Sequence, residues 1–382
     1  MPAPRRIGFN ALYLIPGGVG GTEIYVRNLL RALAEIDHRN EYFVFSNLET
    51  GGEICPREDN FHSIVSPVPA RFRPARLVWE QTILPLQTVT KRLDILFSPG
   101  FSSPAVSWGR RVTVIHDLQH KNQPENFGAV ERLAWDLMVW VSARRSHVLM
   151  TASQDARRDI ARVYGITEGD IRLFRHGAEP EFFTLQEDDA YGPGLPAEAG
   201  VPQCRYLLAV STTHPHKNWD RLIEAYGRLV EQGREEHLVI AGLKGKSWDS
   251  VQRAISGRGL SERVHMPGWQ PRHVLLGLFK YAELLVFPST FEGFGLPVIE
   301  AMAAGIPVVC SDIGPLRETA SGAALFFDPA SSEAMARAIE SVLDEPERQL
   351  EMVRAGMRRA GEFTWTRCAE QTLNVMLETA MG

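Results

Sequence analysis

The chain has 382 residues, 44% of them hydrophobic, which is enough for two ordinary domains that each bury a core. Its 41 Lys and Arg residues against 46 Asp and Glu residues give a net charge of −5, which excludes the overall basic field typical of nucleic-acid-binding proteins. The four cysteines form no CxxC pair, so the sequence indicates neither a zinc knuckle nor a disulfide scaffold and fits a reducing cytoplasm.

The N-terminal segment, Met1–Arg6, is short and basic and runs directly into an expected strand. No signal-peptide apolar region follows the Arg5-Arg6 pair. No uncharged apolar stretch reaches the roughly 18 residues that a membrane-spanning helix needs. We therefore expect a soluble, cytoplasmic protein, with peripheral membrane contact left open.

Short apolar runs recur along the first half of the chain, and their spacing predicts strands separated by helices. The expected strands are Arg6–Asn10, Tyr42–Ser46, Ser63–Ser66, Ile95–Ser98, Val112–His116, Val148–Thr151 and Ile171–Arg175. Helical patterns occur at Thr22–Ile36 and Ala129–Arg145.

The second half repeats this organisation without obvious sequence similarity to the first. The expected strands are Tyr206–Ser211, His237–Ala241, Val264–Met266, Leu284–Pro288, Pro307–Ser311 and Ala324–Phe327. Helices are expected at Trp219–Gln232, Arg272–Tyr281 and Pro297–Ala304.

Apolar runs that are buried on both faces and alternate with helices predict parallel sheets in an α/β fold. The strands are too numerous for one ordinary sheet, so we expect two domains. Residues 187–203 are acidic and then rich in Gly and Pro, which predicts an interdomain linker. The first domain would then span residues 1–186, and the second would begin at residue 204.

The stretch at residues 287–309, FPSTFEGFGLPVIEAMAAGIPVV, predicts a strand, a loop and a helix. The loop contains Gly293 and Gly295, and Pro297 suits the first position of a helix, where a missing N–H costs nothing. Free backbone N–H groups around Phe294–Leu296 would lie at the helix N-terminus. Such a site attracts phosphate through its donors and through the helix dipole.

Two carboxylates, Glu292 and Glu300, flank this expected anion site. Carboxylates would repel a phosphate directly, so they are better explained as acceptors for the hydroxyl groups of a sugar and a ribose. The alternative is an ordinary helix entry, with Gly for the turn and Glu complementing the helix dipole.

The segment around the two carboxylates resembles the E-x7-E element of the retaining GT-B glycosyltransferases, family 4 in particular. In that family the second Glu binds the nucleotide ribose and the first lies beside the donor sugar, positions matched by Glu300 and Glu292. The resemblance implies two Rossmann-like domains facing across a cleft. The first would bind the acceptor, residues 204–364 would bind the nucleotide sugar, and a helix at residues 365–382 would cross back to the first domain.

A glycine-rich loop, Pro16–Glu23, separates the first expected strand from the first helix. Its glycines let the backbone approach a ligand closely. The loop matches neither the dinucleotide-binding pattern nor a Walker sequence. The resemblance implies that Gly20 and Gly21 lie near the donor phosphates or the acceptor; a plain strand–helix turn is the alternative.

His116 is expected at the end of a strand, where ligands bind in open α/β sheets. A histidine there can hydrogen-bond a sugar hydroxyl, although a structural histidine would occupy the same position. The neighbouring Asp117 could orient a ring or cap the next helix. The resemblance implies that His116 contacts the donor sugar.

Lys217 follows the first strand of the second half and would place a positive charge on a diphosphate leaving group. Negative charge accumulates on that group as the bond to the sugar breaks, so a cation stabilises the transition state. A solvated surface lysine is the alternative. The family usually has Arg or another basic residue beside this Lys, whereas here His216 precedes it, which leaves the charge of His216 undecided.

The resemblance to family 4 also places the loops after the expected strands His237–Ala241 and Val264–Met266 in the donor site. Gly242 and Lys244 match a glycine loop beside the nucleotide, with Lys244 within reach of a phosphate. Trp269 lies where the family passes the nucleobase, and either stacks on a base or belongs to the core.

The segment Arg71–Pro85 mixes three arginines with Phe72, Leu77, Trp79, Ile83 and Leu84. Such a segment either lies against anionic lipid or packs into the core. It contains RLVWEQ, and this stretch and the later PHKN are similar to bacterial mannosyltransferases of polysaccharide and O-antigen assembly.

The resemblance implies transfer of a hexose with retention of configuration from a nucleotide-diphosphate sugar, without a cofactor or an essential metal. GDP-mannose is the favoured donor, and a glycan or lipid-linked glycan is the expected acceptor. Lys217 would neutralise the diphosphate, and Glu292 and His116 would position the sugar. A nucleotide-sugar epimerase of the same fold and a non-catalytic nucleotide-sugar binding module are the alternatives.

Overall fold

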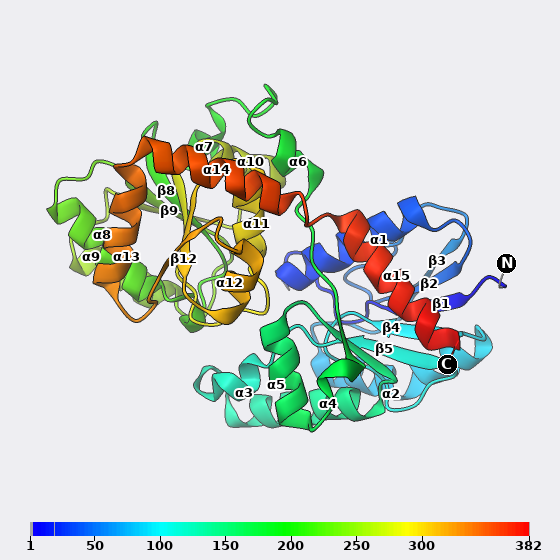
Figure 1. Cartoon of the computed structure of the whole chain (residues 1–382). Coiled ribbons are helices and arrows are strands. Elements are labelled where there is room, and N and C mark those ends of the chain that lie inside the picture. Colours follow the sequence, from blue (N-terminus) through cyan, green and yellow to red (C-terminus); the bar gives the residue numbers. More distant parts are fainter. Residues whose placement is uncertain (1–2, 19, 382) are drawn as a thin grey trace. The chain divides into compact units, whose positions relative to one another are not determined.

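The computed structural model describes residues 3–18 and 20–381 and divides into two compact units. Unit 1 contains the chain up to Gly177 together with the C-terminal segment from Trp365, and unit 2 is Ala178–Thr364 (Figure 1). Each unit is built on its own parallel sheet with helices on both faces, so the predicted two-domain α/β fold is confirmed. Met1 and Gly382, the outer limits of the predicted domains, and Val19 in the glycine-rich loop lie outside the described residues.

In its described part, unit 1 has a seven-stranded parallel sheet with the strand order β3-β2-β1-β4-β5-β6-β7. The chain leaves β1 toward β2 on one side and returns to β4 on the other, so the strand order reverses between β1 and β4. The strands are β1 (Arg6–Asn10), β2 (Glu41–Ser46), β3 (Phe61–Val65), β4 (Ile95–Ser98), β5 (Arg110–Val114), β6 (Val148–Thr151) and β7 (Ile171–Leu173).

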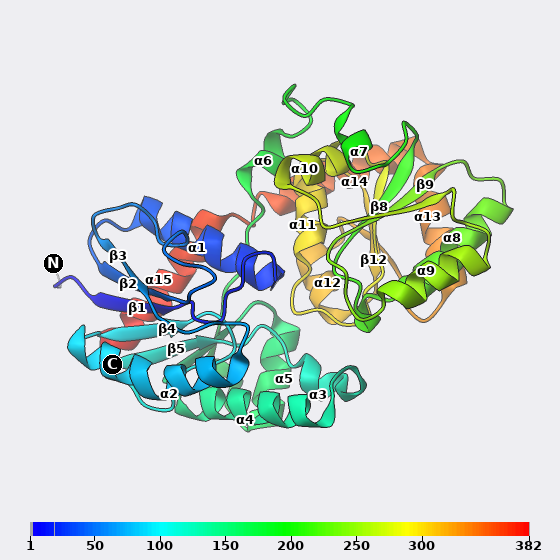
Figure 2. The same cartoon turned by 180° about the vertical axis from the view of Figure 1, so that it is seen from behind.

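Helices cover both faces of the unit 1 sheet because its strands bury side chains on both sides; all four residues of β4, for example, are buried. Helices α1 and α15 pack together on one face, and α2, α4 and α5 lie on the other (Figures 1 and 2). The helices are α1 (Gly21–Ile36), α2 (Arg73–Thr90), α3 (Gln119–Asn122), α4 (Ala129–Arg145), α5 (Gln154–Tyr164) and α15 (Trp365–Met381).

In unit 2, a six-stranded parallel sheet has the order β10-β9-β8-β11-β12-β13. The strands are β8 (Tyr206–Val210), β9 (His237–Ala241), β10 (Val264–Gly268), β11 (Leu284–Phe287), β12 (Val308–Ser311) and β13 (Leu325–Phe327). The helices are α6 (Pro180–Thr184), α7 (Leu195–Glu198), α8 (Trp219–Glu231), α9 (Trp248–Gly257), α10 (Arg272–Lys280), α11 (Leu296–Ala303), α12 (Gly314–Ala320), α13 (Ser332–Leu343) and α14 (Pro346–Ala360).

The boundary between the units lies at Gly177 and Ala178, ahead of the segment 187–203 that the sequence suggests as the linker. That segment is attached to α10 within unit 2. The Lys280 ammonium donates a hydrogen bond to the Asp188 carbonyl (2.8 Å), and the Tyr281 hydroxyl donates to the Tyr191 carbonyl (3.0 Å). Its Gly and Pro residues therefore shape a surface loop within one unit.

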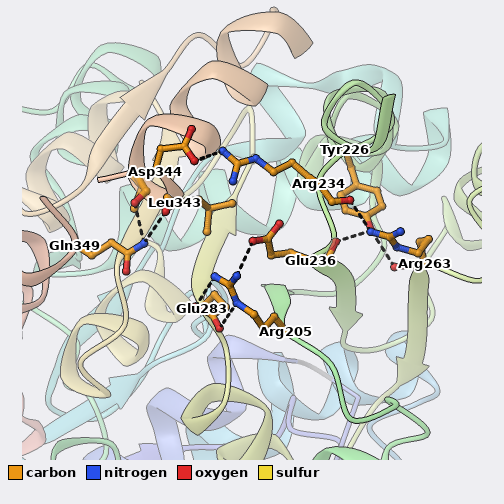
Figure 3. A network of polar contacts seen from close by, with 10 residues as sticks. Arg205, Tyr226, Arg234, Glu236, Arg263, Glu283, Leu343, Asp344 and Gln349 are labelled. Carbon is orange, nitrogen blue, oxygen red and sulfur yellow. Dashed lines mark hydrogen bonds and ion pairs between the residues drawn. The ribbon is translucent and has the colours of Figure 1, made fainter. Parts of the chain in front are cut away.

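Arginines and carboxylates fasten the amino edge of the unit 2 sheet (Figure 3). Arg205, just before β8, lies between Glu236, which precedes β9 (3.3 Å), and Glu283, which precedes β11 (2.9 Å). Glu236 is almost completely buried, and Arg205 supplies the opposite charge beside it. The network stabilises the sheet by joining the segments that precede β8, β9 and β11. Because it lies at the amino ends of these strands, it leaves the carboxyl edge free for ligands.

Candidate active site

An ion pair between Lys217 and Glu292 marks the carboxyl edge of the unit 2 sheet. Lys217 follows β8 and Glu292 follows β11, and these neighbouring strands bring the ammonium Nζ within 2.5 Å of the carboxylate Oε1. Both side chains are largely shielded, with 13% and 12% of their surface exposed. The Lys217 Nζ also lies 5.6 Å from the centre of the Phe287 ring. The pair therefore presents a cation and a carboxylate in a poorly hydrated place, where electrostatic interactions are strong.

Backbone and side-chain hydrogen bonds hold the two loops in register. The Thr290 N–H donates to the His216 carbonyl (2.8 Å). The Asn218 amide donates to the carbonyls of Pro288 (3.1 Å) and Pro329 (2.9 Å), which joins the loops after β8, β11 and β13. The position of Lys217 is thus fixed by neighbours on both sides of it.

His216 is uncharged at neutral pH. Burial, with further contributions from Lys217 and His214, lowers the pKa of His216 to about 3. The rings of His214 and His216 lie nearly parallel, with centroids 5.9 Å apart. The charge of His216, which the sequence leaves undecided, is therefore zero at neutral pH.

The loops after β8 and β9 approach so closely that only glycine fits at position 242. A Cβ atom there would lie 2.1 Å from the Ser211 carbonyl oxygen, and the residue has φ 143°. The Thr213 hydroxyl accepts a hydrogen bond from the Gly245 N–H (2.7 Å), which closes the turn. Lys244 projects from this loop with 65% of its side chain exposed and pairs with Asp249 (3.4 Å).

Helix α11 begins at Leu296 with no side chain to cap it. Gly295 precedes it with φ 101°, and a Cβ atom there would lie 2.5 Å from a methyl group of Leu316. Gly295 provides no side-chain acceptor, Pro297 has no N–H, and the Val298 N–H donates to the Gly295 carbonyl (3.0 Å). The start of the helix therefore offers an anion the Leu296 N–H together with the positive end of the helix dipole. The Phe294 side chain is buried against Phe363 and fixes the loop, so contact with a ligand there would come from the backbone.

Glu300 lies one turn into α11 and is buried, with 6% of its surface exposed. Burial raises the pKa of its carboxyl to about 7, offset by the nearby Arg272 cation and reinforced by Glu179. Arg272 pairs with Glu179 (3.0 Å). Burial and two nearby charges, without a hydrogen bond from the described residues, set this pKa, so the carboxylate oxygens can accept hydrogen bonds from the hydroxyl groups of a ligand.

Trp269 follows β10 and is 59% exposed, which shows that it is not a core residue. Gly268, directly before it, has φ 76° and turns the chain at the end of the strand. The indole therefore offers an apolar surface at the same carboxyl edge of the sheet as Gly242.

In unit 1, His116 lies just beyond β5 in a buried aromatic cluster. Its ring lies 5.2 Å from Tyr25 of α1 and 5.8 Å from His176, measured between ring centroids. Burial lowers the pKa of His116 to about 4, so the ring is neutral at pH 7. Nε2 lies 2.8 Å from the Pro99 carbonyl, which can only accept; Nε2 therefore carries the proton, and Nδ1 is a hydrogen-bond acceptor.

The glycine-rich loop before α1 is fastened by Glu23. Its carboxylate accepts hydrogen bonds from the Gly17 N–H (2.8 Å) and from the Arg27 guanidinium (2.8 Å). Gly20 precedes the helix, and Gly21 is its first residue. Tyr25, one turn further on, contacts His116, so unit 1 brings the glycine-rich loop and the histidine to the same edge of its sheet.

Sequence comparison assigns the family. Residues 200–359 match the model described as "Glycosyl transferases group 1", and residues 19–182 match "Glycosyltransferase Family 4". The chain is 32% identical over 278 residues to O-antigen chain mannosyltransferase B of Escherichia coli, covering 69% of each chain. The chain belongs to the group 1 glycosyltransferases.

Other relatives carry different names. This glycosyltransferase is 28% identical to the MMP alpha-(1->4)-mannosyltransferase of Mycolicibacterium hassiacum, over 93% of this chain and 94% of the relative. It is 24% identical to a D-inositol 3-phosphate glycosyltransferase of Corynebacterium aurimucosum, over 94% and 91%. The family is thus shared by proteins named for several substrates.

Solved structures show the fold. Anabaena HepE, solved in complex with UDP and glucose, superposes with a TM-score of 0.76 at 18% identity, over 98% of this glycosyltransferase and all of HepE. WaaG, described as a glycosyltransferase involved in lipopolysaccharide biosynthesis, gives 0.76 at 17% identity, over 97% and 99%. The predicted GT-B architecture is confirmed.

The structure distributes the predicted residues of the glycosyltransferase between its units. At the carboxyl edge of the unit 2 sheet lie His216, Lys217, Gly242, Lys244, Trp269, Glu292, Gly293, Phe294, Gly295, Leu296 and Glu300. Gly20, Gly21 and His116 lie at the corresponding edge of unit 1. Their roles remain predictions. No group of three or more His, Cys, Asp or Glu side chains among the described residues is placed to hold a metal ion.

Sequence reasoning missed two sets of residues. Arg272 and Glu179 set the electrostatic environment of Glu300 but come from distant parts of the sequence. Arg76 and Glu80 of α2 are buried at 8% and 1% exposure, one helical turn apart, and the Glu80 carboxylate accepts a hydrogen bond from the Ser102 hydroxyl (3.0 Å). For Arg76 and Glu80, the only signal in the sequence is the spacing of two opposite charges by one helical turn within a predominantly apolar segment.

Proposed function

We propose that this group 1 glycosyltransferase transfers a hexose, with retention of configuration, from a nucleotide-diphosphate sugar to a glycan or lipid-linked glycan. GDP-mannose is the favoured donor. The observation that carries the proposal is the buried Glu300 carboxyl, which has hydrogen-bonding capacity to spare at the carboxyl edge of the unit 2 sheet. A ribose supplies two neighbouring hydroxyl donors for such a carboxylate.

The charges and hydrogen-bonding groups of the site suggest roles for the other residues in binding and transfer. The nucleotide diphosphate would take the Leu296 N–H at the positive end of α11 and the Lys217 ammonium, which in the free protein pairs with Glu292. As the bond between the anomeric carbon and the diphosphate oxygen breaks, Lys217 neutralises the departing oxygen. Glu292, released from Lys217, would accept hydroxyl groups of the sugar, and the neutral His116 would accept one through Nδ1. Positive charge from lysine and helix would serve in place of an essential metal.

The mannosyl donor and the polysaccharide setting draw support from relatives. Two of the three relatives described above are named mannosyltransferases, and one of these is named for the O-antigen chain. These names support mannose without defining the acceptor.

A thermal-shift panel tests the donor assignment. GDP, UDP, ADP and dTDP, and their common sugar conjugates, are compared at equal concentration, since a ligand that binds only the folded protein raises its melting temperature. We expect the largest shift with GDP and GDP-mannose, and its loss in Glu300→Ala but not in Glu351→Ala, which changes an exposed carboxylate of α14. A shift confined to another nucleotide would contradict GDP-mannose, and shifts unaffected by Glu300→Ala would contradict the ribose contact.

Turnover assays distinguish a glycosyltransferase from an epimerase and from a non-catalytic binding module. With GDP-mannose, we expect release of GDP that depends on an added glycan acceptor and a product that keeps the anomeric configuration of the donor. Nucleotide release without acceptor, together with a rearranged free sugar, would instead indicate an epimerase. Tight binding without turnover over a broad acceptor panel would indicate a binding module.

A further inference from the structure

Exposed apolar side chains are concentrated on one side of unit 1. Ten of the seventeen large apolar side chains that the described part of the chain exposes lie on α2, on α4 or in the loops beside them. Single exposed apolar residues are normal on protein surfaces, but a contiguous group marks an interaction site. The ten are Phe72, Val78, Leu86, Val89, Val106, Trp108, Val130, Leu133, Leu137 and Trp140.

Helix α4 presents a complete apolar stripe to solvent. Val130, Leu133, Leu137 and Trp140 recur at intervals of three and four residues, which places them on one face, and each is at least half exposed. The face packed against unit 1 is formed by residues such as Val139 and Ala143, both buried. The helix thus has apolar side chains on two faces, of which packing in unit 1 uses one.

Helix α2 exposes a second apolar stripe on the same side of the sheet. Val78, Leu86 and Val89 point outward at helical spacing, and Figures 1 and 2 show α2 and α4 on the face opposite α1 and α15. Arg73 at the start of α2 pairs with Glu131 at the start of α4 (3.4 Å). The starts of the two helices are therefore adjacent, and both stripes lie on the same face of the sheet.

The charged residues on these two helices and in the segments beside them are mostly basic. Apart from the buried Glu80, the acidic residues of the two helices are Glu131 and Asp136, and each is paired with a cation, Asp136 with Lys121 (2.9 Å). Basic side chains flank the stripes, namely Arg71, Lys91, Arg92, Arg132, Arg144 and Arg145. The chain as a whole carries −5, so this positive character is local.

We propose that this surface, the apolar residues of α2 and α4 with their flanking arginines, docks unit 1 on an anionic lipid bilayer. Apolar side chains with a tryptophan on one face and arginines at the edges are the features of a helix that lies in the plane of the membrane interface. None of the described helices is long and apolar enough to span a bilayer. The docking goes beyond the transfer chemistry, which unit 2 and His116 would perform with or without a membrane.

A second copy of the chain fits the surface less well. In a twofold-symmetric dimer the same patch occurs on both partners, so arginines flanking the stripes would face arginines. The unpaired acidic residues that could neutralise them are missing from both described helices. Anionic headgroups supply that negative charge directly.

The test is flotation of the full-length chain with vesicles of phosphatidylcholine alone or with 30% phosphatidylglycerol, at about 0.1 M salt. We compare the wild type with Leu133→Glu/Leu137→Glu, which changes exposed residues of α4. The matched control, Leu48→Glu/Leu350→Glu, adds the same charges at exposed leucines outside the surface. Circular dichroism and GDP release from GDP-mannose with a soluble acceptor show that each variant folds and keeps its basal activity.

We expect flotation with the anionic vesicles only, a decrease of about tenfold or more in binding for Leu133→Glu/Leu137→Glu, and wild-type binding for the control. Absence of wild-type flotation on anionic vesicles would overturn the proposal. Equal binding by both double variants would overturn the assignment to α4. A wild-type dimer that Leu133→Glu/Leu137→Glu dissociates, without vesicle binding, would show that a second copy covers the surface instead. Loss of flotation with intact basal activity would leave the proposed transfer function standing.

Discussion

Replacing Glu300 by glutamine should stabilise unit 2, and the gain should grow with pH. Burial raises the pKa of Glu300 from 4.5 to about 7. Between these values the folded protein keeps a proton that the unfolded chain has lost, so the free energy of unfolding falls as pH rises through this window. The full difference of about 2.5 units corresponds to about 3 kcal/mol.

Glutamine fills the same space and does not ionise, so the variant is free of this pH-dependent cost. Relative to wild type, we expect Glu300→Gln to gain about 2.5 kcal/mol between pH 5 and pH 8, or about 5 to 10 °C in melting temperature for a unit of this size. The assay is thermal or urea unfolding at several pH values, with Glu351→Gln on α14 as the control for losing an exposed carboxylate. Parallel curves of unfolding free energy against pH for Glu300→Gln and wild type would show that the Glu300 carboxyl does not carry this pH dependence.

The Glu300 carboxyl should also couple nucleotide binding to the release of a proton. A ribose that donates hydrogen bonds to the carboxylate favours its charged form, so nucleotide binding near pH 7 should release a proton. Calorimetry in two buffers of different ionisation enthalpy measures that release, and Glu300→Gln should abolish it while weakening binding. Proton release that persists in the variant would place the titrating group elsewhere.

Three further predictions follow from the site and its support. Lys217→Met should lower kcat about 100- to 1,000-fold, because the departing diphosphate loses its cation, and Lys217→Arg should recover part of the rate; a kcat within threefold of wild type in Lys217→Met would contradict the role. His116→Ala should lower kcat by the same factor at every pH from 5.5 to 8, because a pKa of about 4 keeps the imidazole of His116 neutral throughout this range. A ratio of wild-type kcat to variant kcat that changes with pH in this range would count against a neutral acceptor. Arg205→Gln should cost about 1 to 2 kcal/mol in unfolding free energy, because buried Glu236 loses its partner, and leave kcat unchanged; a fall in kcat would show that the amino-edge network reaches the active site.

The sequence predicts the strands well because parallel strands buried on both faces give short apolar runs. All thirteen expected strands are present, several with identical bounds, such as Arg6–Asn10 and His237–Ala241. The predicted α11 is shifted by a single residue, since Gly295 and Pro297 act locally on the backbone. Local patterns of this kind require no knowledge of distant contacts.

What the sequence left undecided depends on distant contacts. Burial by surrounding elements, with Lys217 beside it, decides that His216 is neutral. The composition of the Gly- and Pro-rich segment 187–203 is typical of a linker, yet the side chains of Lys280 at the end of α10 and of Tyr281 just after it, about 90 residues away, fasten it to unit 2. The sequence also does not predict the exposed apolar stripe of α4, because only the packed structure shows which of the two apolar faces of this helix stays exposed.

A crystal structure of the chain with GDP-mannose bound would locate the donor site. We expect the nucleotide at the carboxyl edge of the unit 2 sheet, the ribose hydroxyls within about 3 Å of the Glu300 carboxylate, and the diphosphate within reach of Lys217 and the start of α11. Density for the nucleotide at any other place in unit 2, or a ribose remote from Glu300, would contradict this expectation.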